Sequence, residues 1–151
     1  CDYLKAKEFQ LKRDNPAYKK TKQDDLENMK TGIMGYKGRI HYECAPCINT
    51  WLDDLRTLPK TEFFGEVAKR MDKEIHAGYK LFPCNYIALD MLESGKVYES
   101  HYTAADVERF SKYLEGQLAK INIPNKDDAF LRQCMLTMYA NPARNKMAVM
   151  P

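Results

Sequence analysis

The chain has 151 residues, 44% of them hydrophobic and 30% charged, which gives it enough apolar surface for a folded core and excludes a disordered protein. Its net charge of +3 is too small to indicate a nucleic-acid-binding protein. The longest uncharged stretches, residues 81–89 and 133–143, fall far short of the roughly twenty apolar residues that span a bilayer, which excludes a transmembrane helix.

Two helices are predicted in the first third of the chain. Residues 3–12 carry apolar side chains at loose helical spacing, and Asn15-Pro16 ends that pattern. Leu26 and Met29 suggest a short second helix, which we expect Thr31-Gly32 to end, because glycine weakens a helix.

Residues 38–45 carry the one clear strand pattern of the sequence. Polar and apolar side chains alternate from Arg39 to Cys44, so that Ile40 and Tyr42 would share one face of a strand. A single strand is not stable by itself, and the short stretch 33–36 is the only hairpin partner that the sequence offers. We therefore expect this strand to complete a sheet supplied by an upstream part of the protein.

From residue 48 onward, apolar residues recur at helical spacing. Leu58-Pro59 separates the first of these helices from a longer one that ends at Gly78. Thr103 and Asp106 form a capping-box pattern at the start of a later helix, and we expect Asn141-Pro142 to end the last one. The sequence thus predicts about six helices and one or two strands, which makes residues 1–151 a single, predominantly α-helical unit with the character of an α/β fragment.

Cys44 and Cys47 form a C-x-x-C pair between the predicted strand and a helix, a setting in which a helix N-terminus can activate a thiol for disulfide exchange. A thioredoxin-like fold needs several further strands, whereas the residues after Cys47 have a helical pattern. Scattered cysteines in a chain of normal core size are reduced in a cytoplasmic protein. The sequence offers no second cysteine or histidine pair for a closed zinc site, and we predict no metal ligand.

His101 and Asp106 have the spacing H-x-x-x-x-D, in which a carboxylate can orient an imidazole that acts as general base toward a hydroxyl group. This spacing is the catalytic motif of glycerolipid acyltransferases. Asp106 also fits the local role of helix cap opposite Thr103, and no apolar strand leads into His101. We therefore predict no catalytic residue in this chain and keep His101 and Asp106 only as weak candidates; no cofactor-binding residue is predicted either.

Three stretches of the sequence resemble Bacteroides-type 1-acylglycerol-3-phosphate acyltransferases: residues 25–42 (DLENMKTGIMGYKGRIHY), 82–90 (FPCNYIALD) and 138–142 (MYANP). The resemblance extends over nearly the whole chain. In that family these stretches follow the catalytic domain, so the resemblance implies the C-terminal part of an α/β acyltransferase fold, and the opening residues CDYLKAKEF would come directly after a core strand.

The activity that the resemblance implies for the whole protein is transfer of an acyl group from acyl-CoA or acyl carrier protein to a lysophospholipid-type acceptor, in phospholipid biosynthesis. The catalytic histidine and aspartate of the family would lie upstream of Cys1, because His101 and Asp106 come too late in the family's order. The chain would then be inactive by itself. Its partners would be the N-terminal catalytic half and the membrane surface, in the cytoplasm or at the inner face of the cytoplasmic membrane.

Two other functions stay open from the residues alone. The chain could be a non-catalytic helical module that binds a lipid or a protein through exposed methionine and tyrosine side chains, of which it has eight and ten. It could also be a thiol redox protein that uses Cys44 and Cys47.

Overall fold

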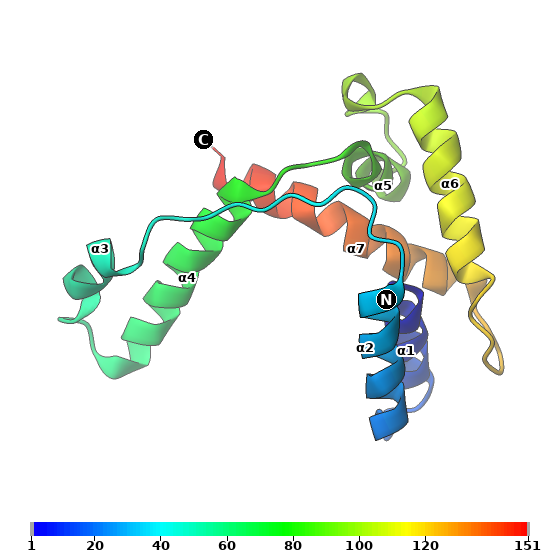
Figure 1. The fold of residues 1–151 in the computed structure, drawn as a ribbon, viewed down its shortest axis with the longest axis horizontal. Coiled ribbons are helices and arrows are strands. Elements are labelled where there is room, and N and C mark those ends of the chain that lie inside the picture. Colours follow the sequence, from blue (N-terminus) through cyan, green and yellow to red (C-terminus); the bar gives the residue numbers. More distant parts are fainter. Residues whose placement is uncertain (1, 151) are drawn as a thin grey trace.

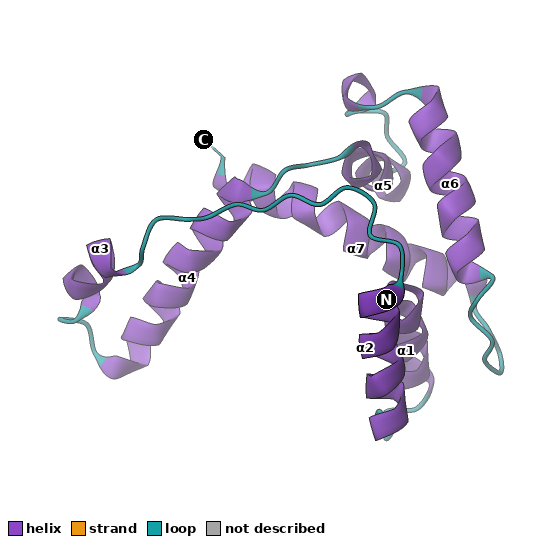
Figure 2. Cartoon of the chain, in the orientation of Figure 1, coloured by secondary structure: helices purple, strands orange, loops and turns teal. Residues whose placement is uncertain are grey.

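The computed structural model describes residues 2–150, and all regular secondary structure within that range is helical (Figures 1 and 2). Seven α-helices follow one another with two short 3-10 helices, η1 and η2, between them. Their bounds are α1 Asp2–Asp14, α2 Lys22–Met34, α3 Asn49–Leu52, η1 Asp53–Leu55, α4 Lys60–Gly78, α5 Pro83–Glu93, η2 Glu99–His101, α6 Ala104–Leu118 and α7 Asp128–Val149. The prediction of a predominantly helical chain is confirmed.

The predicted strand at residues 38–45 does not form within the described residues. This part of the chain is an outstretched connection that runs from the end of α2 past the corner between α4 and α7 to α3 (Figure 1). A strand requires a hydrogen-bonded neighbour. The stretch 33–36, proposed as a hairpin partner, instead ends α2 and begins this connection, which leaves the predicted strand unpaired.

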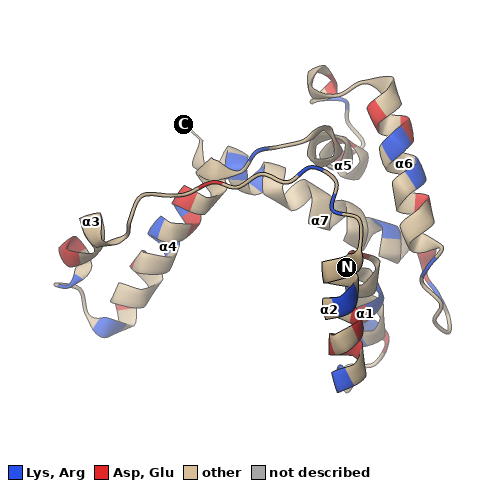
Figure 3. Ribbon diagram, in the orientation of Figure 1, with Lys and Arg blue, Asp and Glu red and all other residues tan. Residues whose placement is uncertain are grey.

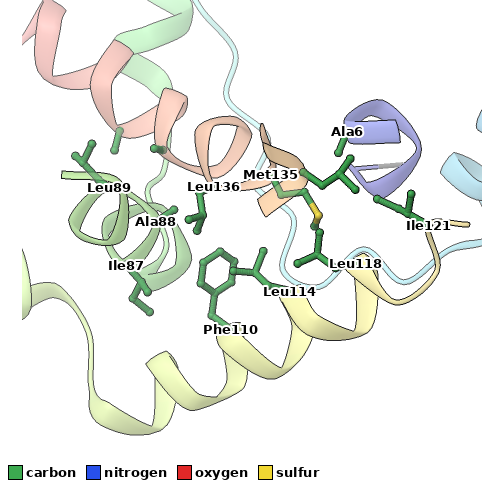
Figure 4. Close-up of a cluster of buried hydrophobic side chains, with 13 residues drawn as sticks. Ala6, Ile87, Ala88, Leu89, Phe110, Leu114, Leu118, Ile121, Met135 and Leu136 are labelled. Carbon is green, nitrogen blue, oxygen red and sulfur yellow. The ribbon is translucent and has the colours of Figure 1, made fainter. Parts of the chain in front are cut away.

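The hydrophobic core lies between α1, α5, α6 and α7 (Figure 4). Helix α7 crosses the molecule and contributes the largest share of buried side chains, while one turn of α1 and the inner faces of α5 and α6 pack against it. The core residues are Ala6, Ile87, Ala88, Leu89, Phe110, Leu114, Leu118, Ile121, Leu131, Met135, Leu136, Ala140 and Ala143. Small residues on α5 and α7 let these two helices approach closely.

Two helix starts are fixed by capping boxes. The Thr103 side chain accepts a hydrogen bond from the backbone N–H of Asp106, and the Asp106 side chain accepts one from the backbone N–H of Thr103, as the sequence predicts. Thr21 and Asp24 form the same arrangement at α2. These two groups of bonds satisfy donors that a helix start otherwise leaves free.

Two predicted helix ends are wrong. Helix α2 continues through Thr31-Gly32 to Met34, because one glycine costs only about 1 kcal/mol in a helix. Helix α7 continues through Pro142 to Val149. An interior proline costs about 3 kcal/mol, but its neighbours Ala140 and Ala143 are completely buried, and this packing holds the last turns in place.

Candidate functional site

The molecule divides into two regions of different burial. We call α1, α5, η2, α6 and α7 the cored region, and residues 22–78, which include α2, α3, η1 and α4, the open region. Leu55 is the one buried residue between Lys22 and Gly78, and every residue from Ile33 to Thr50 is exposed. Figure 1 shows α4 and α3 extending away from the rest of the chain.

The open region exposes large apolar side chains that helices normally bury. On α2 and the connection after it, the exposed residues are Leu26, Met29, Ile33, Met34, Tyr36, Ile40, Tyr42 and Ile48; on α4 they are Phe64, Met71 and Ile75. Tyr36 is 92% exposed and Tyr42 is 86% exposed, values at which an aromatic ring contributes almost nothing to a core. Exposed apolar side chains concentrated in this way are typical of surfaces that bind another protein or a membrane.

Charge does not dominate this surface. Figure 3 shows basic and acidic residues interspersed along α1, α2, α4 and α6. Glu8 of α1 is nearly completely buried and binds Lys5, Lys12 and Lys20. Hydrogen bonding from Lys12, followed by that from Lys5 and Lys20, lowers the pKa of Glu8 to about 2 although burial opposes the shift. Lys20 thereby attaches the loop between α1 and α2 to the cored region.

His101 lies at the end of η2 and is exposed. Its ring stacks on the ring of Tyr86, with the two centroids 4.2 Å apart and the planes 11° apart. Tyr98 contacts the same imidazole at a tilt, with a centroid separation of 6.4 Å. The imidazole therefore packs against a pair of tyrosine rings that also contact each other, while His101 stays exposed.

Asp106 is occupied by the start of α6. One of its carboxylate oxygens accepts hydrogen bonds from the Thr103 hydroxyl at 2.7 Å and the Thr103 backbone N–H at 3.0 Å. These bonds, first the one from the hydroxyl, lower the pKa of Asp106. The other oxygen lies 3.5 Å from Arg109. Within the described residues no hydrogen bond joins His101 to Asp106, so this geometry does not make them a general-base pair.

Asp90 is the residue that fixes the loop carrying His101, and the sequence pattern gave no sign of it. Its buried carboxylate accepts hydrogen bonds from the backbone N–H groups of Val97 and Tyr98 and from the Tyr102 hydroxyl at 2.7 Å. The bond to Asp90 raises the pKa of Tyr102 to about 12. A buried carboxylate with this many donors is a structural anchor.

A second polar cluster, half-buried, joins α1, α6 and α7. One oxygen of Asp2 accepts hydrogen bonds from Tyr113 at 2.6 Å and Tyr139 at 2.7 Å, and the two hydroxyls are 3.1 Å apart. Burial raises the pKa of the Asp2 carboxyl, but these bonds outweigh it and hold that pKa below its usual range. Burial and the bond to Asp2 raise the pKa of Tyr113 to about 12. The cluster fastens the first turn of α1.

Cys44 and Cys47 are both exposed free thiols. The helix after them, α3, has four residues and lacks a side-chain cap, and the chain around the pair is the outstretched connection. The Thr50 hydroxyl donates to the Cys47 carbonyl at 2.8 Å. The surroundings thus differ from the strand and long helix that hold a thioredoxin-like C-x-x-C pair.

An open groove of about 640 Å³ lies between α4 and the end of α7. Its lining includes the small residues Gly65, Ala68, Ala148 and Val149 together with charged residues of both signs. His76 in the groove lies 3.3 Å from the side-chain nitrogen of Asn145. Over residues 2–150 the structure has no group of three or more acidic, histidine or cysteine side chains placed to bind a metal ion.

None of the helices in the described part of the chain combines the length and the apolar character that crossing a membrane requires.

Comparisons with protein-family models, with curated proteins and with solved structures found no match to this chain.

Proposed function

We propose that this chain is the helical C-terminal part of an acyltransferase that moves an acyl group from acyl-CoA or acyl carrier protein to a lysophospholipid-type acceptor. In this proposal α2 and α4 pack against the catalytic part of the enzyme at the inner membrane face. The observation that carries the proposal is the open region, in which two long helices expose the apolar side chains that they would bury against a partner.

The surroundings of His101 support an accessory role. Acyl transfer to a hydroxyl requires a base within hydrogen-bond reach of that hydroxyl, and a carboxylate that orients the base. The Asp106 carboxylate is bonded to Thr103, while His101 stacks on Tyr86. A carboxylate that caps a helix does not orient an imidazole, so the proposal assigns the chemistry to residues upstream of this chain.

The test is acyl transfer from labelled acyl-CoA to 1-acylglycerol-3-phosphate. The chain by itself, the longer protein with its upstream part, and the His101→Ala variant of each are compared, with His76→Ala as the matched histidine control. We expect transfer by the longer protein alone, unaffected by either substitution. Transfer by this chain by itself, abolished in His101→Ala and kept in His76→Ala, would instead make His101 the catalytic base.

A non-catalytic binding module is the second candidate, and the cored region favours it. Four helices enclose a continuous core, and within the described residues no buried side-chain polar atom lacks a hydrogen-bond partner. Exposed Met29, Met34, Tyr36 and Tyr42 would then hold the partner. Absence of transfer from both the chain and the longer protein would favour this module.

A further inference from the structure

The connection between α2 and α3 has a backbone that is free to pair. Within the described chain, residues 36–46 make no backbone–backbone hydrogen bond, and all of them are exposed. Gly38 has φ +67, a left-handed conformation that favours glycine and marks the start of the alternating stretch. Free backbone donors and acceptors next to alternating side chains are the features by which an exposed edge recruits a strand.

The two sides of residues 39–43 differ in what they contact. The polar side lies against the chain itself, since the Arg39 guanidinium sits 5.0 Å from the centre of the Phe82 ring and the Glu43 side chain packs on Gly78. His41 lies 3.1 Å from Glu43 on that side. The apolar side, Ile40 and Tyr42, is exposed. The segment is thus held in place while its edges and its apolar side stay accessible.

The sequence of the segment is complementary to itself in one antiparallel register. If two copies pair about His41, Arg39 of each copy lies opposite Glu43 of the other, and Ile40 lies opposite Tyr42. Opposite charges and an aromatic ring beside a β-branched residue are the cross-strand pairs that stabilise a sheet. In this register each copy presents the same residues to the other across a twofold axis, the commonest symmetry of soluble dimers.

We propose that residues 39–43 form an interaction surface for a second copy of this chain, by antiparallel strand pairing centred on His41. The proposal is independent of the acyltransferase function. It concerns dimerisation of the chain by itself. In a longer enzyme, an edge strand of the catalytic part would compete for the same backbone hydrogen-bonding groups. A two-stranded ribbon is weak by itself, so the dimer should form over about 10 µM to about 1 mM chain.

Analytical ultracentrifugation of the chain tests the proposal by charge reversal. Arg39→Glu places two acidic side chains opposite each other at both ends of the paired segment. Glu43→Arg places two basic side chains opposite each other at the same positions. Each should weaken dimerisation about tenfold or more, whereas the double variant Arg39→Glu/Glu43→Arg should restore it. Arg56→Glu is the matched control, because Arg56 is exposed and its ion pair is with Asp53, three residues earlier and outside the segment 39–43.

Hydrogen exchange of the amides of residues 39–43 gives the second measurement. These amides should become protected as the wild-type dimer forms and stay unprotected in Arg39→Glu at the same concentration, with far-UV circular dichroism showing that the helices persist. A wild-type chain that stays monomeric to about 1 mM, or a double variant that dimerises no better than the single ones, would overturn the proposal. Protection that appears only in the longer protein would assign the segment to the catalytic part, whatever the acyl-transfer assay shows.

Discussion

The cored region and the open region are both helical, but different interactions determine their stability. In the cored region α7 has neighbours on several sides, and Leu131 and Met135 are completely buried. In the open region α2 has no buried residue, although its capping box is complete. Capping and helix propensity can therefore define where a helix starts without giving it a tertiary partner.

A leucine-to-alanine substitution in each region should show the largest difference in the free energy of unfolding. Leu131→Ala removes a completely buried side chain and should lower the free energy of unfolding by about 2–5 kcal/mol. Leu26→Ala, at a position 59% exposed, should change it by less than about 0.5 kcal/mol. Urea unfolding followed by circular dichroism measures both values.

Trp51 offers a local check on that comparison, because it is the single tryptophan and lies in the open region with Arg70 of α4 5.5 Å from its ring. Fluorescence of Trp51 should change at lower urea than the circular dichroism signal. Coincident transitions, shifted together by Leu131→Ala, would show that the two regions unfold as one unit and would contradict the comparison.

The anchor of the His101 loop should give the next largest effect. Asp90→Asn replaces a buried carboxylate that binds two backbone N–H groups and the Tyr102 hydroxyl, and should cost about 1–3 kcal/mol. Glu93→Gln, three residues later, removes only an exposed ion pair with Arg144 and should cost under about 1 kcal/mol. Equal urea midpoints for the two variants would refute an anchoring role for Asp90.

Acid should weaken the attachment of the open region through Glu8. The pKa of Glu8 is about 2 in the folded chain and 4.5 ordinarily, so its contribution is complete above about pH 4.5 and is lost as the pH falls toward 2. Glu8→Gln should thus be less stable than the wild type at neutral pH. The difference should shrink below about pH 4.5, as urea midpoints over a pH series will measure. A difference that is constant with pH would contradict this role.

The smallest effect is expected at the ion pair between Arg13 and Asp127, which are 2.8 Å apart and both well exposed. Solvent and salt screen such pairs, so Arg13→Gln should lower the free energy of unfolding less than any of the substitutions at Leu131, Asp90 and Glu8. Part of any loss would come from the contact of the guanidinium with the Phe130 ring, 4.1 Å away. Thermal unfolding at low and high salt measures the ionic part, and a large loss that salt does not alter would point to the ring contact.

Sequence patterns predicted the features that neighbouring residues determine. Thr103 and Asp106 cap α6 as expected, since the capping box needs only residues three apart. Pro142 shows the limit of such reasoning: its local preference to end a helix is overridden by the burial of Ala140 and Ala143, which depends on distant helices. The roles of Asp90 and Asp2 could not be predicted either, because their partners are brought close only by the fold.

For the candidate sites too, the sequence predicted what neighbouring residues determine and missed what the tertiary contacts determine. The spacing of His101 and Asp106 fits a catalytic pair, but spacing alone does not tell whether a carboxylate already has another partner. The alternation from Arg39 to Cys44 predicted a strand, and this prediction is wrong for the described chain, because the segment has no hydrogen-bonded neighbour there. The acyltransferase assignment stays a proposal that the transfer assay will test.

The proline inside α7 has a mechanical consequence for the molecule. Pro142 lacks the N–H that would bond to the carbonyl one turn before it, and the contacts of Asn145 and Lys146 with the end of α4 lie beyond this missing bond. Ala143, directly after the proline, is completely buried and ties this part of α7 to the core. The position of α4 therefore depends on side-chain packing at Ala143 as well as on the backbone hydrogen bonds of α7.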